Sequence, residues 1–247
     1  QLTSLDVSQN TALTDLKCYD NSLTTLNVSL NTALTVLECQ NNQITSLNVS
    51  LNTALTNLFC FSNPLNSLDV SLNTSLDWLL CGGSQLTVLD VSSNTALTTL
   101  QCNDNLLTSL DVSPNIALTN LVCGGNQLTA LDLSQNTALT ELYCLDNQLA
   151  CLNLKNGNNT SLFISAGSNS ALNCIEVDDD VWATANWTNI DAASSFSTDC
   201  NNACSSVVGI NELSNTPKHL IKIVDFMGRE TNYKLNTSLI YIYDDGS

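Results

Sequence analysis

The sequence is poor in the residues that most enzymes use for proton transfer and metal binding. Its 247 residues contain one histidine, one methionine and six Lys and Arg together. The single imidazole, His219, lies in the C-terminal part, so the repeats that precede it have no histidine to act as a general base. No glycine-rich phosphate loop and no zinc-ligand spacing is present. We therefore predict that the protein is not an enzyme and uses no cofactor.

Positive charge is almost absent, and long apolar runs are missing altogether. The net charge is −17. Residues 1–148 contain twelve Asp and Glu residues but only one basic residue, Lys17. Such a surface repels nucleic acid and anionic lipid. No apolar run approaches the roughly 18 residues of a membrane-spanning helix. These features predict partners other than nucleic acid, and no membrane span.

What the sequence has in abundance is a repeat of 21 residues. The segment Leu23 to Gln43, LTTLNVSLNTALTVLECQNNQ, recurs with little drift. Further copies begin at Leu2, Ile44, Leu65, Leu86, Leu107 and Leu128. No single copy can bury its own apolar side chains, so neighbouring copies must stack as the coils of a solenoid. Gln1 stands directly before a repeat leucine, and an uncapped solenoid would expose an apolar end. We therefore expect further sequence to precede it.

Seven cysteines recur in one apolar slot of the repeat. They are Cys18, Cys39, Cys60, Cys81, Cys102, Cys123 and Cys144. In neighbouring parallel strands about 4.8 Å apart, such side chains point the same way and not at each other. We interpret them as buried thiols that act as small hydrophobic residues, rather than as disulfides or a metal array.

Asparagine forms two further columns, each of which we expect to close a turn by bonding backbone groups of the adjacent coil. The first column is Asn21, Asn42, Asn63, Ser84, Asn105, Asn126 and Asn147, with Ser84 as its one break. The second column is Asn10, Asn31, Asn52, Asn73, Asn94, Asn115 and Asn136. A third column of Asp and Asn, from Asp6 to Asp132, could form a calcium row, but we favour a role in turns.

The string LxxLxCxxNxL is the leucine-rich-repeat signature, in which Leu, Leu and Cys point inward from a short strand. Repeats such as LTSLDVSPNIALTNLVCGGNQ resemble those of the internalin family of cell-wall-anchored adhesins. The resemblance implies a right-handed parallel β coil, curved as a horseshoe, with little helix. It also implies a buried cysteine ladder and extracellular adhesion. The wall-sorting motif of that family is absent here, so that route of attachment does not carry over.

The repeat loosens after Gln148, as expected of a capping region. Ala166 takes the cysteine slot of a degraded copy, and LNCIEV restarts the pattern up to Val177. We assign 1–177 to the solenoid and 178–204 to a cap, in which a short helix or turns place Trp182 and Trp187 over the apolar end. Clustered carboxylates at 178–180 suit calcium, but we favour a turn or helix start.

Four cysteines lie outside the ladder, and spacing alone leaves their pairing open. Cys151 and Cys174 align at the same slot of adjacent coils. We therefore favour Cys151–Cys174 together with Cys200–Cys204, with a Cys174–Cys200 bond that closes the cap as the main competitor.

The composition changes in residues 205–247, which hold four of the six basic residues. Leu220 to Phe226 and Leu239 to Tyr243 read as strands around the turn-rich GRETNYKLNTS, so we expect a small β-hairpin. The ordered strings IKIVDFMGRET and LIYIYDDGS resemble the C-terminal sorting domain of the type IX secretion system of Bacteroidetes. The resemblance implies contact with the secretion machinery, passage across the outer membrane, and a secreted or cell-surface location.

All aromatic residues of 1–148 fall in slots that strand alternation sends outward on the concave face. We predict a ligand-binding surface there, made by Tyr19, Phe59, Phe61, Trp78, Leu80, Val122 and Tyr143. Alternatively, these side chains merely cover the sheet and contact each other. Gly82, Gly83, Gly124 and Gly125 either leave room for a ligand or reflect neutral loss of side chains.

The function that we predict is adhesion or recognition by a secreted or cell-surface protein, through a protein or glycan ligand on this face. The alternative is an accessory protein that binds polysaccharide at the cell surface.

Overall fold

A computed structural model of the chain describes residues 1–200, 204, 220–224 and 240–243. The chain divides into two units, Gln1–Ser206 and Val207–Ser247. The first unit is a parallel β-solenoid with one short α-helix, as the leucine-rich-repeat pattern predicts. Within the described residues, no helix is long and apolar enough to cross a membrane.

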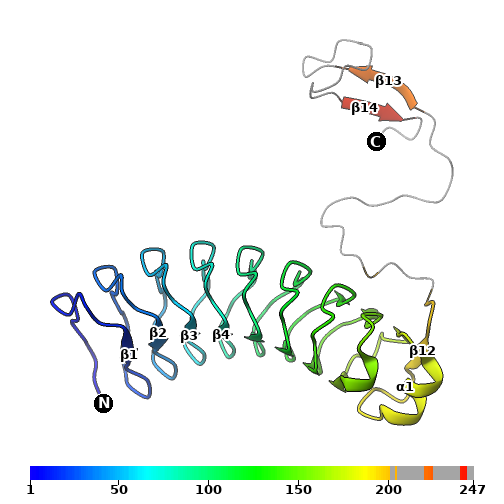
Figure 1. Cartoon of the computed structure of the whole chain (residues 1–247), viewed down its shortest axis with the longest axis horizontal. Helices are drawn as coiled ribbons and strands as arrows, with labels where there is room; N and C mark the ends of the chain where they lie inside the picture. Colours follow the sequence, from blue (N-terminus) through cyan, green and yellow to red (C-terminus); the bar gives the residue numbers. More distant parts are fainter. Residues whose placement is uncertain (201–203, 205–219, 225–239, 244–247) are drawn as a thin grey trace. The chain divides into compact units, whose positions relative to one another are not determined.

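The coils of the first unit stack side by side along an arc, with one short strand from each coil on the inner side (Figure 1). These strands form an eight-stranded parallel sheet in the order β1-β2-β3-β4-β5-β6-β8-β10. Their bounds are β1 Asp15–Lys17, β2 Val36–Glu38, β3 Asn57–Phe59, β4 Trp78–Leu80, β5 Thr99–Gln101, β6 Asn120–Val122, β8 Glu141–Tyr143 and β10 Phe163–Ser165.

A second parallel sheet lies in the opposite half of the last coils and has the order β12-β11-β9-β7. Its strands are β7 Ala130–Asp132, β9 Cys151–Asn153, β11 Cys174–Glu176 and β12 Ser195–Ser197. A 3₁₀ turn, η1, spans Asn159–Ser161 between β9 and β10. From β1 to β8 the register advances by one 21-residue repeat per strand, and from β8 to β10 by 22 residues, so equivalent side chains stand in straight columns.

The core is the interior of the coils, which is filled by the repeat leucines, valines and cysteines. The central leucine of each strand from β2 to β6 is fully buried, while the residues on either side are partly exposed. Alternation of side chains along a strand therefore separates a constant interior from a variable exterior.

The first asparagine column bonds the coils together as predicted. The Oδ1 of Asn42 accepts from the backbone N–H of Leu23 at 2.9 Å. Its Nδ2 donates to the carbonyls of Cys18 and Cys39, both at 3.0 Å. Asn169 repeats this arrangement in the degraded coil and extends the column by one member. Each amide thus satisfies turn groups of two successive coils.

The second asparagine column bonds differently. Its Nδ2 atoms donate to two carbonyls that both belong to the preceding coil, as Asn52 does to Val28 and Asn31 at 3.0 and 2.9 Å. The Oδ1 atoms of Asn31, Asn52, Asn73, Asn94, Asn115 and Asn136 are buried and accept no hydrogen bond from the described protein. This column therefore ties coils through its donors alone.

The seven ladder cysteines are unpaired and buried, in agreement with the interpretation of the repeat. Burial raises the pKa of Cys18 to about 11, and the pKa values of Cys102 and Cys144 to about 12. Burial also raises the pKa of Cys60 and Cys81 well above the ordinary value, with a further contribution from the next thiol in the ladder. These thiols are protonated at neutral pH and are not poised for nucleophilic chemistry.

The cap contains the expected short helix, α1, at Asp180–Asn186. Asp179 caps it by accepting from the Trp182 N–H at 2.9 Å, and Asp178 accepts from the Gly157 N–H at 2.9 Å. The carboxylates at 178–180 thus start a helix and fix a turn, which is the interpretation that we favoured over calcium. Trp187 is buried against the last coils, with Trp182 packed beside it.

The favoured disulfide pairing is wrong, and its competitor is correct. The bonds are Cys174–Cys200 and Cys151–Cys204, with Cα separations of 5.9 and 5.3 Å. Cys151 and Cys174 do occupy neighbouring parallel strands, β9 and β11. Side chains in one register of parallel strands point the same way, so each cysteine reaches the chain that follows β12 instead. The two bonds therefore fasten the end of the cap to the last coils.

Of the C-terminal unit, two strands are described, β13 Leu220–Val224 and β14 Ile240–Tyr243. They pair antiparallel, as the predicted hairpin requires. The connecting segment GRETNYKLNTS, His219 and the DDG motif lie outside the described residues, as does most of the range 205–247.

Candidate functional site

The outward side of the eight-stranded sheet, which we call the sheet face, carries the aromatic residues that the sequence singles out. Phe59 ends β3 and Trp78 begins β4, and the two strands are paired in register. Their ring centroids lie 6.2 Å apart with an interplanar angle of 32°. Trp78 is 44% exposed although it sits in the middle of a sheet. An aromatic pair on a rigid support is therefore available to solvent.

Two further predicted residues border this pair. Leu80 lies opposite Phe59 in the β3–β4 register and is half-buried. Phe61 follows Phe59 by two positions and is also half-buried. Together, Phe59, Phe61, Trp78 and Leu80 form what we call the central patch.

The remaining predicted residues are not part of the central patch. Val122 and Tyr143 are neighbours in the register of β6 and β8, toward the C-terminal end of the sheet. Tyr19 is exposed in the first coil and makes no aromatic contact with a described residue. The polar strand β5 separates Val122 and Tyr143 from the central patch. The structure thus brings four of the seven predicted residues together and leaves three apart.

Sequence reasoning missed Phe163, which extends the aromatic surface at its C-terminal end. Its ring lies 5.4 Å from that of Tyr143, and it is 44% exposed. The signal was available, because aligning Ala166 with the cysteine slot places Phe163 in the outward slot of Glu141. Because the repeat loosens after residue 148, this alignment is less evident there than in the regular copies.

The glycines that follow β4 and β6 do not leave space for a ligand. A Cβ on Gly82 would lie 2.6 Å from the Oδ1 of Asn103, and one on Gly124 would lie 3.0 Å from the carbonyl of Leu145. Gly83 adopts φ +62°, in a turn position where other coils have Asp, Asn or Ser at similar angles. Atoms of the next coil occupy the space beside Gly82 and Gly124. The positive φ of the turn accounts for the glycine at position 83.

The charges of the sheet face lie around the central patch. Lys17 forms an ion pair with Glu38 across β1 and β2 at 2.6 Å, which raises the pKa of the lysine. Asp77, directly before Trp78, accepts a hydrogen bond from the Thr98 hydroxyl. Because Lys17 is already paired, the rim of the sheet face is acidic.

The Asp and Asn column that could have bound calcium serves turns instead. Asp69 accepts from the Ser71 N–H at 2.9 Å, and Asn48 makes the equivalent bond to Ser50 at 3.0 Å. Hydrogen bonds from Ser71 lower the pKa of Asp69, and those from Ser92 do the same for Asp90. Among the described residues, no group of three or more His, Cys, Asp or Glu is placed to hold a metal.

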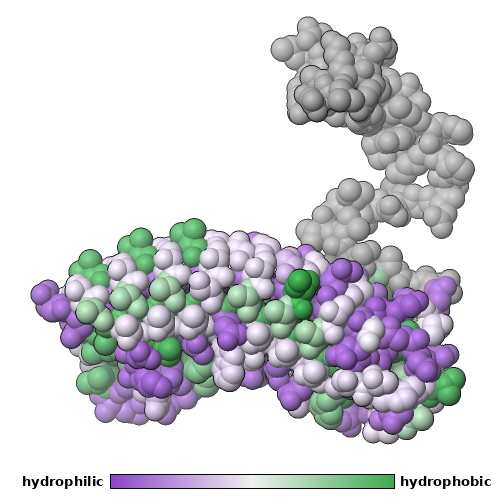
Figure 2. Space-filling model, in the orientation of Figure 1, coloured by the Kyte–Doolittle hydropathy of each residue, from purple (hydrophilic) through white to green (hydrophobic). Residues whose placement is uncertain are grey.

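The structure also shows three exposed leucines, which are difficult to distinguish from the core leucines in the repeat pattern. Leu30, Leu51 and Leu72 occupy one slot of three successive coils and are 55 to 56% exposed. Figure 2 shows apolar residues in a row along the upper edge of the N-terminal coils. The equivalent slots in later coils hold Ser93, Pro114 and Gln135. That contrast with invariant core leucines was the signal that these three leucines are not part of the core.

Comparison with known proteins gives structural neighbours, while no family model and no curated protein matches the chain. The functional domain of InlJ from Listeria monocytogenes, which includes a cysteine ladder, is 42% identical with a TM-score of 0.65. The match covers 71% of this chain and 41% of that chain.

Two other solved structures share the architecture at lower identity. Internalin C2 of Listeria monocytogenes is 22% identical with a TM-score of 0.62, and the match covers 77% of this chain and 84% of that one. The Leptospira interrogans protein LIC12759 is 22% identical with a TM-score of 0.59, over 69% of this chain and 51% of that one. The chain thus has an internalin-like leucine-rich-repeat fold, and it spans about half or less of the InlJ and LIC12759 chains.

Proposed function

We propose that this protein is a non-enzymatic recognition protein that binds a protein ligand through the central patch of its sheet face. The observation that carries the proposal is the exposed Trp78 paired with Phe59 on adjacent strands. The repeat has many variable slots, yet in residues 1–148 it places every aromatic residue on this one face. This placement supports a role of the central patch in recognition.

Physical chemistry supports such a role for the central patch. Aromatic side chains dominate the binding energy of interfaces, above all when they lie at the centre and polar groups surround them. A β-sheet support keeps the rings in place, so little conformational entropy is lost on binding. The acidic rim favours a ligand with basic groups around an apolar centre.

The double variant Phe59→Ala/Trp78→Ala tests this function. We expect it to lose at least tenfold in affinity for a ligand captured by the wild-type protein, because both rings of the patch are removed. The measurement is a pull-down from host or bacterial surface extracts, followed by titration of the captured protein, with a glycan array in parallel.

Val88→Ala is the matched control, since Val88 is exposed but lies outside the sheet face strands. It should bind like the wild type. Unchanged binding of the double variant would remove the central patch from the function. Binding only on the glycan array, lost in the double variant, would favour the polysaccharide alternative on the same face.

The cellular location is part of the proposal. Two disulfides suit an oxidising compartment outside the cytoplasm. The resemblance of residues 205–247 to a type IX sorting domain supports export by that machinery, with the protein released or held at the cell surface. Deleting residues 207–247 should then retain the protein inside the cell of a type IX secreting host, and unchanged secretion would contradict this role of the tail.

A further inference from the structure

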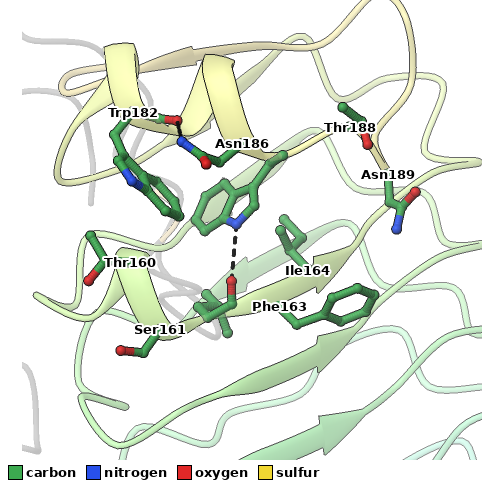
Figure 3. Close-up of a pocket in the computed structure, with 10 residues that line it drawn as sticks. Thr160, Ser161, Phe163, Ile164, Trp182, Asn186, Thr188 and Asn189 are labelled. Carbon is green, nitrogen blue, oxygen red and sulfur yellow. Dashed lines mark hydrogen bonds between the residues drawn. The ribbon is translucent and has the colours of Figure 1, made fainter.

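A pocket of about 390 Å³ opens between α1 and the last coils. Trp182 and Asn186 of α1 form one side, and Thr160 and Ser161 of η1 form the other (Figure 3). Phe163, with Thr188 and Asn189, lies toward the remaining side in the same view. The volume falls within the range of about 300–1,000 Å³ that is usual for small-molecule sites.

The aromatic wall of the pocket is held rigidly. The indole N–H of Trp187 donates to the Leu162 carbonyl at 3.0 Å, drawn as a dashed line in Figure 3. Trp182 meets Trp187 edge to face, with centroids 5.6 Å apart and planes at 87°. The Asn186 amide donates to the Trp182 carbonyl at 2.8 Å. The wall is thus formed before any ligand arrives, which limits the entropy lost on binding.

The polar groups of the pocket are neutral and available. The Asn189 carbonyl accepts from the Ala166 N–H at 2.9 Å, which fixes its backbone, whereas its side-chain amide bonds no described residue. The hydroxyls of Ser161 and Thr188 are likewise exposed and form no hydrogen bond within the described protein. None of the lining residues carries a charge. The pocket therefore offers hydrogen bonds without an ionic partner.

We propose that this pocket is a binding site for a neutral sugar unit. A pyranose has a face of polarised C–H groups that stacks on the electron-rich face of an aromatic ring. Its rim of hydroxyls both donates and accepts, which matches the free Asn189 amide and the hydroxyls of Ser161 and Thr188. An apolar peptide side chain would leave those polar groups desolvated and unpaired, and a charged ligand would find no counter-charge. Neutral sugar is thus the ligand class that satisfies both kinds of lining.

This sugar site is distinct from the central patch and does not depend on it. Its residues come from the cap, η1 and the end of the sheet, whereas the central patch lies on β3 and β4. Phe163 belongs to the pocket lining and also contacts Tyr143, so the pocket opens at the C-terminal end of the sheet face.

The test uses the full chain and methyl glycosides of glucose, galactose, mannose and N-acetylglucosamine. Saturation-transfer NMR should show saturable binding of at least one of them, in the millimolar range expected for so small a ligand. The chain has three tryptophans. In a Trp78→Phe background the two that remain are Trp182 and Trp187, so a fluorescence change on titration reports the pocket itself.

Two variants and one control locate the site. Trp182→Ala should weaken glycoside binding at least tenfold, and Asn189→Ala about threefold or more. Asn189 is exposed, so its variant keeps the test valid even if Trp182→Ala loosens the cap, which thermal melting would reveal. Asn173→Ala, an exposed asparagine outside the pocket, should bind like the wild type.

Three results would overturn the sugar site. One is the absence of saturable binding by every glycoside. Another is unchanged binding in both pocket variants. The third is tighter binding of N-acetylleucinamide than of any glycoside, which would assign the pocket to a peptide side chain. Because this test and the central-patch test use different residues and probes, either proposal can fail alone.

Discussion

Raising the pH from 8 to 10.5 is expected to unfold the protein, because the cysteine ladder holds its thiols protonated in the folded state. Burial raises the pKa values of Cys102 and Cys144 to about 12. It also raises those of Cys39, Cys60, Cys81 and Cys123 well above the ordinary value. In the unfolded chain each thiol ionises near pH 8.5, as free cysteine does. Above that pH the unfolded state binds fewer protons, so stability falls as pH rises.

The size of the effect follows from the number of thiols. Each thiol that is ionised in the unfolded state and protonated in the folded state removes about 1.4 kcal/mol of unfolding free energy per pH unit. Six such thiols together remove about 8 kcal/mol per pH unit once the unfolded thiols are fully ionised. A typical domain has about 5–15 kcal/mol of stability. The whole unfolding free energy should therefore be lost within about two pH units above the thiol pKa of the unfolded chain.

Urea denaturation followed by circular dichroism at pH 7, 9, 9.5 and 10 measures this loss. The Cys81→Ala variant should be less stable at pH 7 but lose about 1.4 kcal/mol less per pH unit above pH 9. Alanine is accommodated in this slot, since Ala166 fills it in the degraded coil and is fully buried. An unchanged pH slope in the variant would show that the alkaline transition has another source, such as tyrosine ionisation.

Alkylation of the folded protein at pH 7.5 supplies an independent check on burial. The interior thiols should label only after unfolding, because the reactive species is the thiolate and both access and ionisation are suppressed. Cys18, in the first coil, is the least buried of the seven and should label first. Rapid labelling of Cys81 in the folded state would contradict both the ladder geometry and the alkaline prediction.

The solenoid could be predicted from the sequence because its rules act within one repeat. A leucine at a fixed position is buried in every coil for the same reason, so seven copies amount to seven consistent observations of one slot. The asparagine columns followed from the same logic, since a turn that recurs must satisfy the same backbone groups each time. The aromatic residues on the sheet face followed from strand alternation alone.

The features that could not be predicted arise where the repeat ends or where two coils differ. The disulfide pairing depends on the path of the chain after β12, which no repeat position encodes. The pocket beside α1 requires the angle at which Trp182 and Trp187 pack against η1. The space beside Gly82 is closed by Asn103 of the following coil. Each of these features depends on how two segments of different sequence pack together, and a single sequence gives no direct indication of that packing.

Ser84 interrupts the first asparagine column, and the structure shows which hydrogen bonds are lost at this position. Elsewhere the column residue accepts from the N–H of the leucine or isoleucine that begins its own repeat, as Asn63 does from Ile44 at 3.0 Å. At the break, the Leu65 N–H turns to the Asn63 carbonyl at 2.8 Å instead. The Ser84 hydroxyl is buried and has no hydrogen-bond partner among the described residues. Serine is too short to replace the amide.

Substitutions at the break and at an intact column position should therefore have opposite signs. Ser84→Asn should stabilise the protein by about 1–2 kcal/mol, because the amide restores the bonds that its neighbours in the column make. Asn126→Ala should cost about 3–6 kcal/mol, since it leaves the Leu107 N–H and the carbonyls of Cys102 and Cys123 without their amide partner. Urea denaturation at pH 7 measures both changes.

Asn66→Ala is the control for removing an asparagine that has no place in either column, because Asn66 is exposed and outside both. Its effect should stay within about 0.5 kcal/mol. A stabilised Ser84→Asn variant together with a destabilised Asn126→Ala variant would establish that the column holds the coils together one amide at a time. If Ser84→Asn destabilises the protein while Asn126→Ala behaves as expected, the fourth coil has adapted its turn to serine. The hydrogen bond from the Leu65 N–H to the Asn63 carbonyl would then be more favourable in this coil than the bond to a column asparagine.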